Sequence, residues 1–201
     1  FSLEIFLPLV LLLATSFLWE LSAYLKTLKA EAGINKSPVK VWNGQEFSEF
    51  PTREIKVGNI VLVNEGEKVP ADLLILCGSE KITVDEFRIK GVKNLQVKYP
   101  IRELPDEDQP LSEVLPELSY TYGTIKASQP SADFNYFEGK YKDPSSPKAA
   151  DLSINNLILR GSKLKETEWV VGIATYTGMQ TKVWLNFKKT FKSSTHIEGR
   201  C

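Results

Sequence analysis

Cysteine and histidine are scarce in this sequence, and neither sign of charge is in excess. The 201 residues include two cysteines, Cys77 and Cys201, which cannot form the dense disulfide framework of a small secreted domain. The single histidine, His196, excludes histidine-rich metal clusters, and we expect no metal site. The 25 basic and 25 acidic residues cancel, so no overall field would attract nucleic acid. We therefore expect a reducing compartment and no nucleic-acid partner.

The first part of the chain differs in composition from the rest. From Ile5 to Leu25 the one charged side chain is Glu20, and a helix over these residues would be roughly 30 Å long, the thickness of a bilayer core. Lys26 and Lys29 follow at once, which places the downstream chain on the cytoplasmic side. A buried soluble helix and a signal peptide are the alternatives, but a signal peptide would begin with positive charge. The sequence therefore predicts a transmembrane helix in an integral membrane protein, and the missing initiator methionine indicates a fragment.

Strand patterns dominate from Val39 onward. Val39–Trp42 alternates with period two, Asn43-Gly44 is a typical hairpin turn, and a returning strand should begin near Glu46. Further strand-like runs follow, one of them wholly apolar as in the core of a sandwich. They are Ile60–Val63, Leu73–Cys77, Tyr122–Ile125, Leu157–Leu159 and Trp169–Tyr176. The sequence predicts a mainly β domain.

Two stretches rich in proline and polar residues, Tyr99–Ser119 and Asp143–Lys148, are typical of loops. The last stretch, Lys182–Cys201, is basic and has no apolar period of its own. We therefore divide the chain into a membrane helix with its cytoplasmic extension at 1–38, a domain at 39–187 and a linker at 188–201. Gly33 and Pro38 are expected to end the first helix.

Three blocks of sequence resemble the actuator domain of the P-type ATPases, and specifically the lipid-flippase branch. The first block carries Pro70-Ala71-Asp72, which the resemblance assigns to a tight turn between two strands, with the aspartate bonding nearby backbone amides. The second runs from Gly123-Thr124-Ile125 to Phe137–Tyr141. The third is the most specific, and its signature residues are Asn156, Leu159, Arg160, Gly161, Trp169, Tyr176, Thr177 and Gly178.

The resemblance implies a distorted jelly-roll or β-sandwich preceded by the end of the second transmembrane helix. It also implies the wider context of a multi-pass membrane protein in a lipid bilayer. The partners would be the phosphorylation and nucleotide-binding domains of the same chain, with an accessory transmembrane subunit as a further candidate. ATP and Mg²⁺ are implied for the full-length protein, whereas these 201 residues are expected to bind no cofactor themselves.

In this family the actuator domain contributes Asp-Gly-Glu-Thr, whose glutamate activates the water that hydrolyses an aspartyl phosphate on another domain. The flanking residues Val84–Ile89 and Asn94–Lys98 match the family pattern, and between them stand Lys90, Gly91, Val92 and Lys93. Valine cannot accept a proton from water, so the resemblance implies that the dephosphorylation step is lost. The chain then holds no complete active site.

Recruiting Asp85 or Glu86 instead would move the carboxylate about six residues, roughly 20 Å along an extended chain, and would destroy both flank matches, so we reject this alignment. Two interpretations of the lysines stay open. Lys90 and Lys93 could bind a phosphate without hydrolysing it, or could simply be solvated lysines on an exposed loop.

Three functions compete. The first is a working phospholipid translocase with an atypical loop. The second, which we favour, is a flippase-like module that no longer turns over and serves regulation or scaffolding. The third is a membrane-tethered β-sandwich that only binds a partner. Flippase-like regions of this kind occur fused to guanylyl cyclases. The second hypothesis is preferred because the loss falls on the one residue that the chemistry cannot spare.

Overall fold

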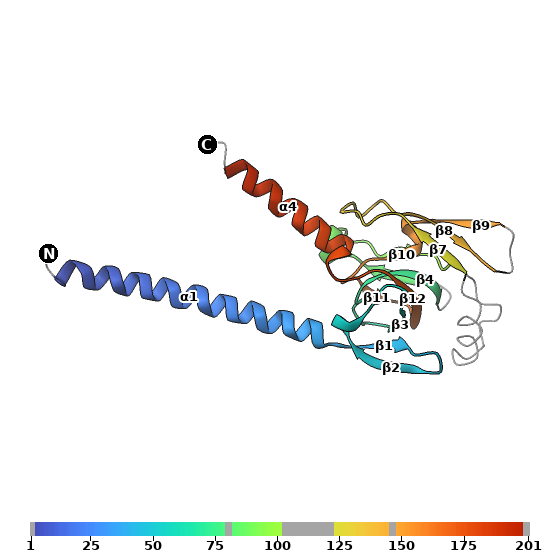
Figure 1. The fold of residues 1–201 in the computed structure, drawn as a ribbon, viewed down its shortest axis with the longest axis horizontal. Coiled ribbons are helices and arrows are strands. Elements are labelled where there is room, and N and C mark those ends of the chain that lie inside the picture. Colours follow the sequence, from blue (N-terminus) through green and yellow to red (C-terminus); the bar gives the residue numbers. More distant parts are fainter. Residues whose placement is uncertain (1–2, 79–81, 102–122, 145–147, 199–201) are drawn as a thin grey trace.

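A six-stranded antiparallel sheet forms the centre of the computed structural model, in the order β10-β4-β12-β3-β1-β2 (Figure 1). The model describes residues 3–78, 82–101, 123–144 and 148–198. The strands of this sheet are β1 (Pro38–Trp42), β2 (Phe47–Pro51), β3 (Ile60–Asn64), β4 (Asp72–Gly78), β10 (Leu157–Ile158) and β12 (Trp169–Tyr176). The predicted mainly β fold is confirmed.

Strand β4 lies in the middle of the fold and is buried on both faces. Leu73 and Ile75 point into one apolar core, whereas Leu74 points into another. Successive side chains of a strand project to opposite faces, so a strand covered on both sides must be apolar at every position. The unbroken apolar run therefore predicted this strand correctly.

A small three-stranded sheet covers each face of the central one. The sheet β11-β5-β6 comprises Lys163–Lys165, Ile82–Asp85 and Gln96–Lys98, and its Val84 and Leu164 share a core with Leu73. The sheet β7-β8-β9 comprises Thr124–Ala127, Glu138–Lys142 and Ala149–Ser153, and its Tyr141 and Leu152 share the other core with Leu74. The result is a layered β structure, while the jelly-roll connectivity implied by the resemblance stays a prediction.

Short helical elements connect the strands. They are η1 (Thr52–Glu54), α2 (Phe87–Lys90), η2 (Ile154–Asn156) and η3 (Gly178–Gln180). The predicted strands Val39–Trp42, Ile60–Val63, Leu73–Cys77 and Trp169–Tyr176 are confirmed, as is the return of the first hairpin after Glu46. Most of the predicted loop Tyr99–Ser119 lies outside the described residues, as do residues 145–147 of the second one.

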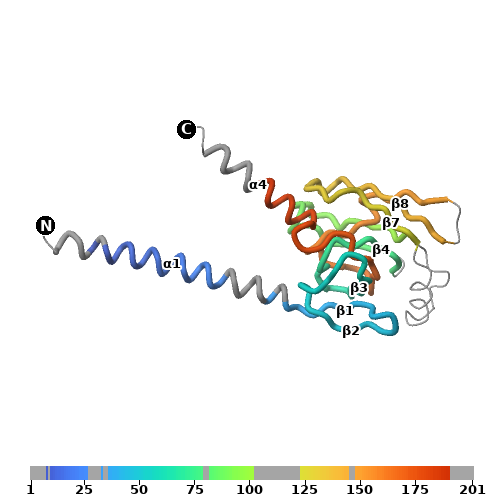
Figure 2. The backbone as a smooth tube through the Cα atoms, viewed as in Figure 1, coloured from blue at the N-terminus to red at the C-terminus, as the bar shows by residue number. Residues whose placement is uncertain are grey.

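Helix α1 (Leu3–Lys36) projects away from the sheets (Figure 2). It runs through Gly33, so the predicted end at this glycine is wrong, and Pro38 instead begins β1. The reason is that an exposed glycine within a helix lowers its stability without interrupting its hydrogen bonds. None of the helices in the described part of the chain is long and apolar enough to cross a membrane. The predicted membrane span is thus not confirmed.

Helix α4 (Lys182–Glu198) leaves the domain on the same side as α1 (Figure 1). The sequence showed only a basic tail without an apolar period here, and no helix was predicted. Its first amide is held by Asp72, a residue distant in the sequence, with Lys182 N to Oδ2 at 2.7 Å. Because a distant residue binds the first amide of this helix, the spacing of apolar residues within the helix does not show where it begins.

Candidate functional site

The segment that the resemblance assigns to the dephosphorylation loop, Lys90–Lys93, begins at the last residue of a single helical turn, α2 (Phe87–Lys90). The Asp85 carboxylate accepts a hydrogen bond from the Phe87 amide at 2.9 Å, and the Lys90 amide donates to the Glu86 carbonyl at 2.9 Å. Gly91 ends the turn at φ +72°, a left-handed conformation that glycine adopts without strain. The extended distance of roughly 20 Å used to dismiss Asp85 and Glu86 is therefore wrong, because a helix rises only about 1.5 Å per residue.

Lys90 is not a solvated lysine, because its ammonium lies 2.8 Å from a carboxylate oxygen of Glu86, and its side chain is 14% exposed. The Glu86 side chain is completely buried, and the Lys98 ammonium lies 3.5 Å from its other oxygen. Lys98 Nζ also donates to the Ile154 carbonyl at 3.0 Å. Burial lowers the pKa of Lys98, and the Glu86 charge opposes this shift. We call Glu86, Lys90 and Lys98 the buried charge cluster.

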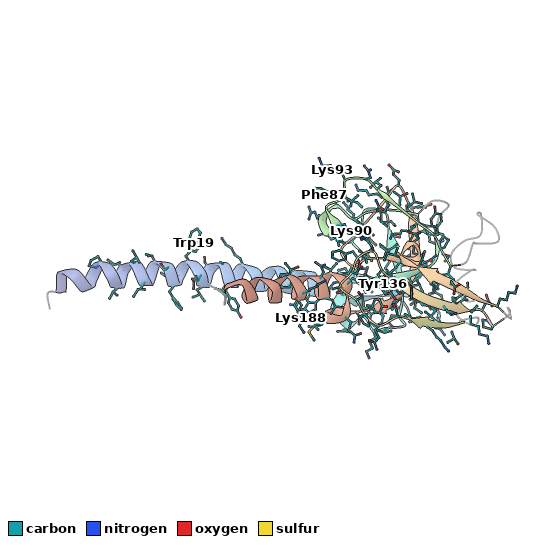
Figure 3. All side chains as sticks on the ribbon, turned by 90° about the horizontal axis from the view of Figure 1, so that it is seen from above. Trp19, Phe87, Lys90, Lys93, Tyr136 and Lys188 are labelled. Atoms are coloured by element: carbon teal, nitrogen blue, oxygen red, sulfur yellow. The ribbon has the colours of Figure 1, made fainter. Side chains whose placement is uncertain are left out.

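The remaining motif positions lie outside this cluster. Val92 is 41% exposed and Lys93 is exposed, and Figure 3 shows Lys93 beyond Phe87 and Lys90 at one edge of the domain. Two lysines acting together on one phosphate therefore have little support, because one of them is already paired with Glu86. Of the two nearby carboxylates, Glu86 is inaccessible to water, and partly exposed Asp85 uses one oxygen to accept the Phe87 amide.

The turn residue Asp72 has a different role from the one expected. Its carboxylate does not bond amides of its own turn: Oδ1 accepts the Arg160 amide at 2.8 Å and Oδ2 accepts the Lys182 amide at 2.7 Å. Burial raises the pKa of Asp72 to about 6, and these two hydrogen bonds and the nearby cations oppose the shift. Ala71 is buried beside it, and Pro70 is half-buried at the same turn. Asp72 thus joins three separate segments.

Several signature residues gather around this aspartate. Arg160 Nη1 donates to the Gly178 carbonyl at 3.4 Å, and the Gly161 amide donates to the Val69 carbonyl at 2.8 Å. The hydroxyl of Tyr176 donates to the Ser128 carbonyl at 2.6 Å. Sequence reasoning named these residues, and Thr181-Lys182 belongs to the same matching block, but it did not predict that the buried side chain of Lys182 completes the group.

The other signature residues have structural surroundings. Leu159 is buried in the core shared with β8, and Trp169 packs on a second core at the far end of β12. The Asn156 side chain accepts the Ser153 amide at 2.9 Å and donates to the Tyr99 carbonyl at 3.1 Å. Thr177 precedes η3 with extended backbone.

Sequence reasoning named Glu86 and Lys98 but did not predict that Glu86 pairs with both Lys90 and Lys98. The spacing of four between Glu86 and Lys90 is the signal that could have found the first pair, because such residues face each other on a helix. No comparable signal existed for Lys98, which comes from strand β6. No group of three metal-ligating side chains occurs among the described residues.

Comparisons with known proteins place this fold in a family. Residues 33–185 match the model of the P-type ATPase actuator domain. Guanylate cyclase beta of Plasmodium berghei (strain Anka) is 36% identical over 151 residues, which are 74% of this chain and 5% of that protein. A phospholipid-transporting ATPase of Schizosaccharomyces pombe is 30% identical over 194 residues, 95% of this chain and 15% of that protein. A probable phospholipid-transporting ATPase of Arabidopsis thaliana is 33% identical over 203 residues, 96% of this chain and 16% of that protein.

The chain thus spans 16% or less of the length of each of these three relatives. The match covers the central sheet, both smaller sheets and the junction at Asp72. The chain belongs to the P-type ATPases, and residues 33–185 are an actuator domain of that family with similarity to the phospholipid-transporting members.

Proposed function

We propose that this actuator domain belongs to a flippase-like module that does not complete the ATPase cycle and serves a regulatory or scaffolding role in a larger protein. The observation that carries the proposal is the chemistry of the side chains at residues 85–93, which we call the α2 loop. The position assigned to the water-activating glutamate is Val92, Glu86 is fully buried against Lys90, and Asp85 precedes α2 with one oxygen accepting the Phe87 amide. A general base must accept a proton from the water it activates, and valine has no group that can do so.

The wider setting is part of the same proposal. Relatives named as guanylate cyclases and relatives named as phospholipid-transporting ATPases both contain a segment similar to this chain. In a protein that joins a cyclase to a flippase-like region, an actuator domain that does not cycle would support or regulate the attached cyclase. The full-length protein would bind ATP and Mg²⁺ on other domains, and a partner subunit would contact its membrane part.

We propose further that α1 is a membrane helix and that the domain lies on its cytoplasmic side. Leu11, Leu12, Leu13 and Phe17 are each more than half exposed along α1, a run of apolar surface that favours contact with lipid. The lysines that follow the apolar stretch favour the cytoplasmic side for the sheets.

The test is phosphoenzyme decay in the full-length protein. Val92→Glu should accelerate the decay, whereas Val92→Gln, which has the same size without a carboxylate, should not. Lys90 is retained in both variants, because Lys90→Asp would place a second acid beside buried Glu86. ATP-driven lipid transport by the protein with native Val92 would refute the proposal and support the working translocase, which the phospholipid-transporting relatives favour.

The same measurement has an informative negative result. If neither variant changes the rate of phosphoenzyme decay, residues other than Val92 also prevent dephosphorylation, and those of the phosphorylation domain are the next to test. The third hypothesis, a tethered sandwich that only binds a partner, has no observation of its own in its favour.

A further inference from the structure

Lys182 is a wholly buried lysine at the first residue of α4, 1% exposed as a residue. Its ammonium donates to three carbonyl oxygens: that of Tyr136 at 2.6 Å, that of Asp133 at 2.9 Å and that of Ser131 at 3.4 Å. An ammonium group has three donors and no acceptor, so these three oxygens satisfy it completely. We call residues 131–136, in the connection between β7 and β8, the carbonyl loop.

The same residue is also held through its backbone. The Lys182 amide donates to Asp72 Oδ2 at 2.7 Å, so the main chain is attached to the start of β4 while the side chain is attached to the carbonyl loop. One turn later, Asn186 Nδ2 donates to the Ala132 carbonyl at 3.2 Å. The beginning of α4 is therefore held at three points, on two different parts of the domain.

The carbonyl loop is itself anchored to the core. The hydroxyl of Tyr176, at the end of β12, donates to the Ser128 carbonyl at 2.6 Å, and the side chain of Phe137 packs edge-on against the Tyr176 ring with centroids 6.2 Å apart. Loops generally move more than the sheets they connect. This loop is attached on both sides of residues 131–136, so it can serve as a firm support for α4.

A buried ammonium is costly unless its charge and its donors are compensated. Here Asp72 and Asp133 supply negative charge nearby, and burial lowers the pKa of Lys182 against their effect. A leucine or methionine could fill the same space without that cost. Lysine differs from both in its charge and in its ability to donate to three carbonyl oxygens of one loop, and the second property is a constraint on geometry.

We propose that Lys182 is a positioning residue, a built-in cation that fixes the direction in which α4 leaves the actuator domain. The proposal does not depend on whether the domain still supports dephosphorylation, because no residue of the α2 loop takes part in these contacts.

The direction of α4 can be measured as a distance between two spin labels in the 201-residue chain. We place them at Glu49→Cys on edge strand β2 and Lys188→Cys on α4, both exposed, with Cys201 replaced by serine. Cys77 does not compete for the label, since it is buried and burial raises the pKa of its thiol to about 12. We expect one narrow distance peak, lost in Lys182→Met and kept in Lys189→Met, which changes an exposed lysine of the same helix.

Chemical rescue separates the role of the cation from simple packing. In Lys182→Ala, added propylammonium should restore the narrow peak, because it supplies the missing N–H donors to the carbonyl loop. Tetramethylammonium at the same concentration carries the same charge without donors and should not restore it. An unchanged distance in Lys182→Met, or equal recovery with both ions, would overturn the proposal.

A measurement on the unsubstituted chain covers the case in which these variants do not fold. Nitrogen-15 NMR should show slow exchange with water for the protons of the Lys182 ammonium, as a buried and triply bonded group requires, and for those of Lys98, which is also buried and bonded. The signal that persists in Lys98→Met is that of Lys182. If the Lys182 ammonium exchanges at the rate of a free side chain, its contacts with the carbonyl loop do not exist in solution and the proposal is refuted.

Discussion

Lys90 offers the clearest test of how the α2 loop is built. Replacing it with methionine keeps the length of the side chain but removes one of the two cations beside Glu86, whose carboxylate is completely buried. Breaking a buried ion pair by removing one partner costs about 3–5 kcal/mol. Lys98 stays 3.5 Å from the same carboxylate, and the Lys90 side chain is 14% exposed. We therefore expect Lys90→Met to lower the free energy of unfolding by about 2 kcal/mol.

Urea unfolding of matched variants measures this difference. Lys93→Met removes an exposed lysine three residues away and should change the free energy of unfolding by less than about 0.5 kcal/mol. A double-mutant cycle with Glu86→Gln should give a coupling of about 1–2 kcal/mol between positions 86 and 90. If Lys90→Met and Lys93→Met destabilise equally, Lys90 is an ordinary surface lysine and the buried charge cluster is refuted.

Three further substitutions test other parts of the fold. Asp72 has a pKa of about 6 against 3.8 for its ordinary value, so the stability it contributes is complete below pH 3.8 and is lost as the pH rises to about 6. From the size of the pKa shift, the free energy of unfolding should fall by about 3 kcal/mol over this range. In Asp72→Asn this fall should be absent, and the same dependence of unfolding free energy on pH in both proteins would contradict the prediction. Gly91→Ala should lower the thermal stability by about 1 kcal/mol, since φ is +72° there although nothing crowds an added Cβ. Tyr176→Phe should cost about 1–2 kcal/mol in urea unfolding by leaving the Ser128 carbonyl without its donor, and a neutral result would remove that hydrogen bond from the account.

The strands could be predicted because their information is local. The alternation in Val39–Trp42 and the apolar run Leu73–Cys77 follow directly from whether one or both faces of a strand are covered. Helix α4 could not be predicted in this way. Its start depends on Asp72, 110 positions away in the sequence, and periodicity within residues 182–198 carries no trace of that contact.

In the candidate site, too, the features set by local sequence could be predicted and those set by distant contacts could not. The motif positions were assigned from the matching residues on either side, and this assignment stays a prediction; Val92 is 41% exposed. The pairing of Lys90 depended on whether residues 87–90 form a helical turn, which sequence alone left open. For Asp72 the sequence suggested contacts within its own turn, as is usual for a carboxylate there, whereas its oxygens accept the amides of Arg160 and Lys182 across the domain.

The exposure of Val92 has a consequence for how such domains change over evolutionary time. At 41% exposure, just after a turn whose form is set by the buried charge cluster and by Gly91, a valine and a glutamate at position 92 should give the fold nearly the same stability. Under the proposed assignment, selection for stability would then not act on the position of the reactive acid. A cycling and a non-cycling domain would differ there by one side chain, and folding would oppose neither change.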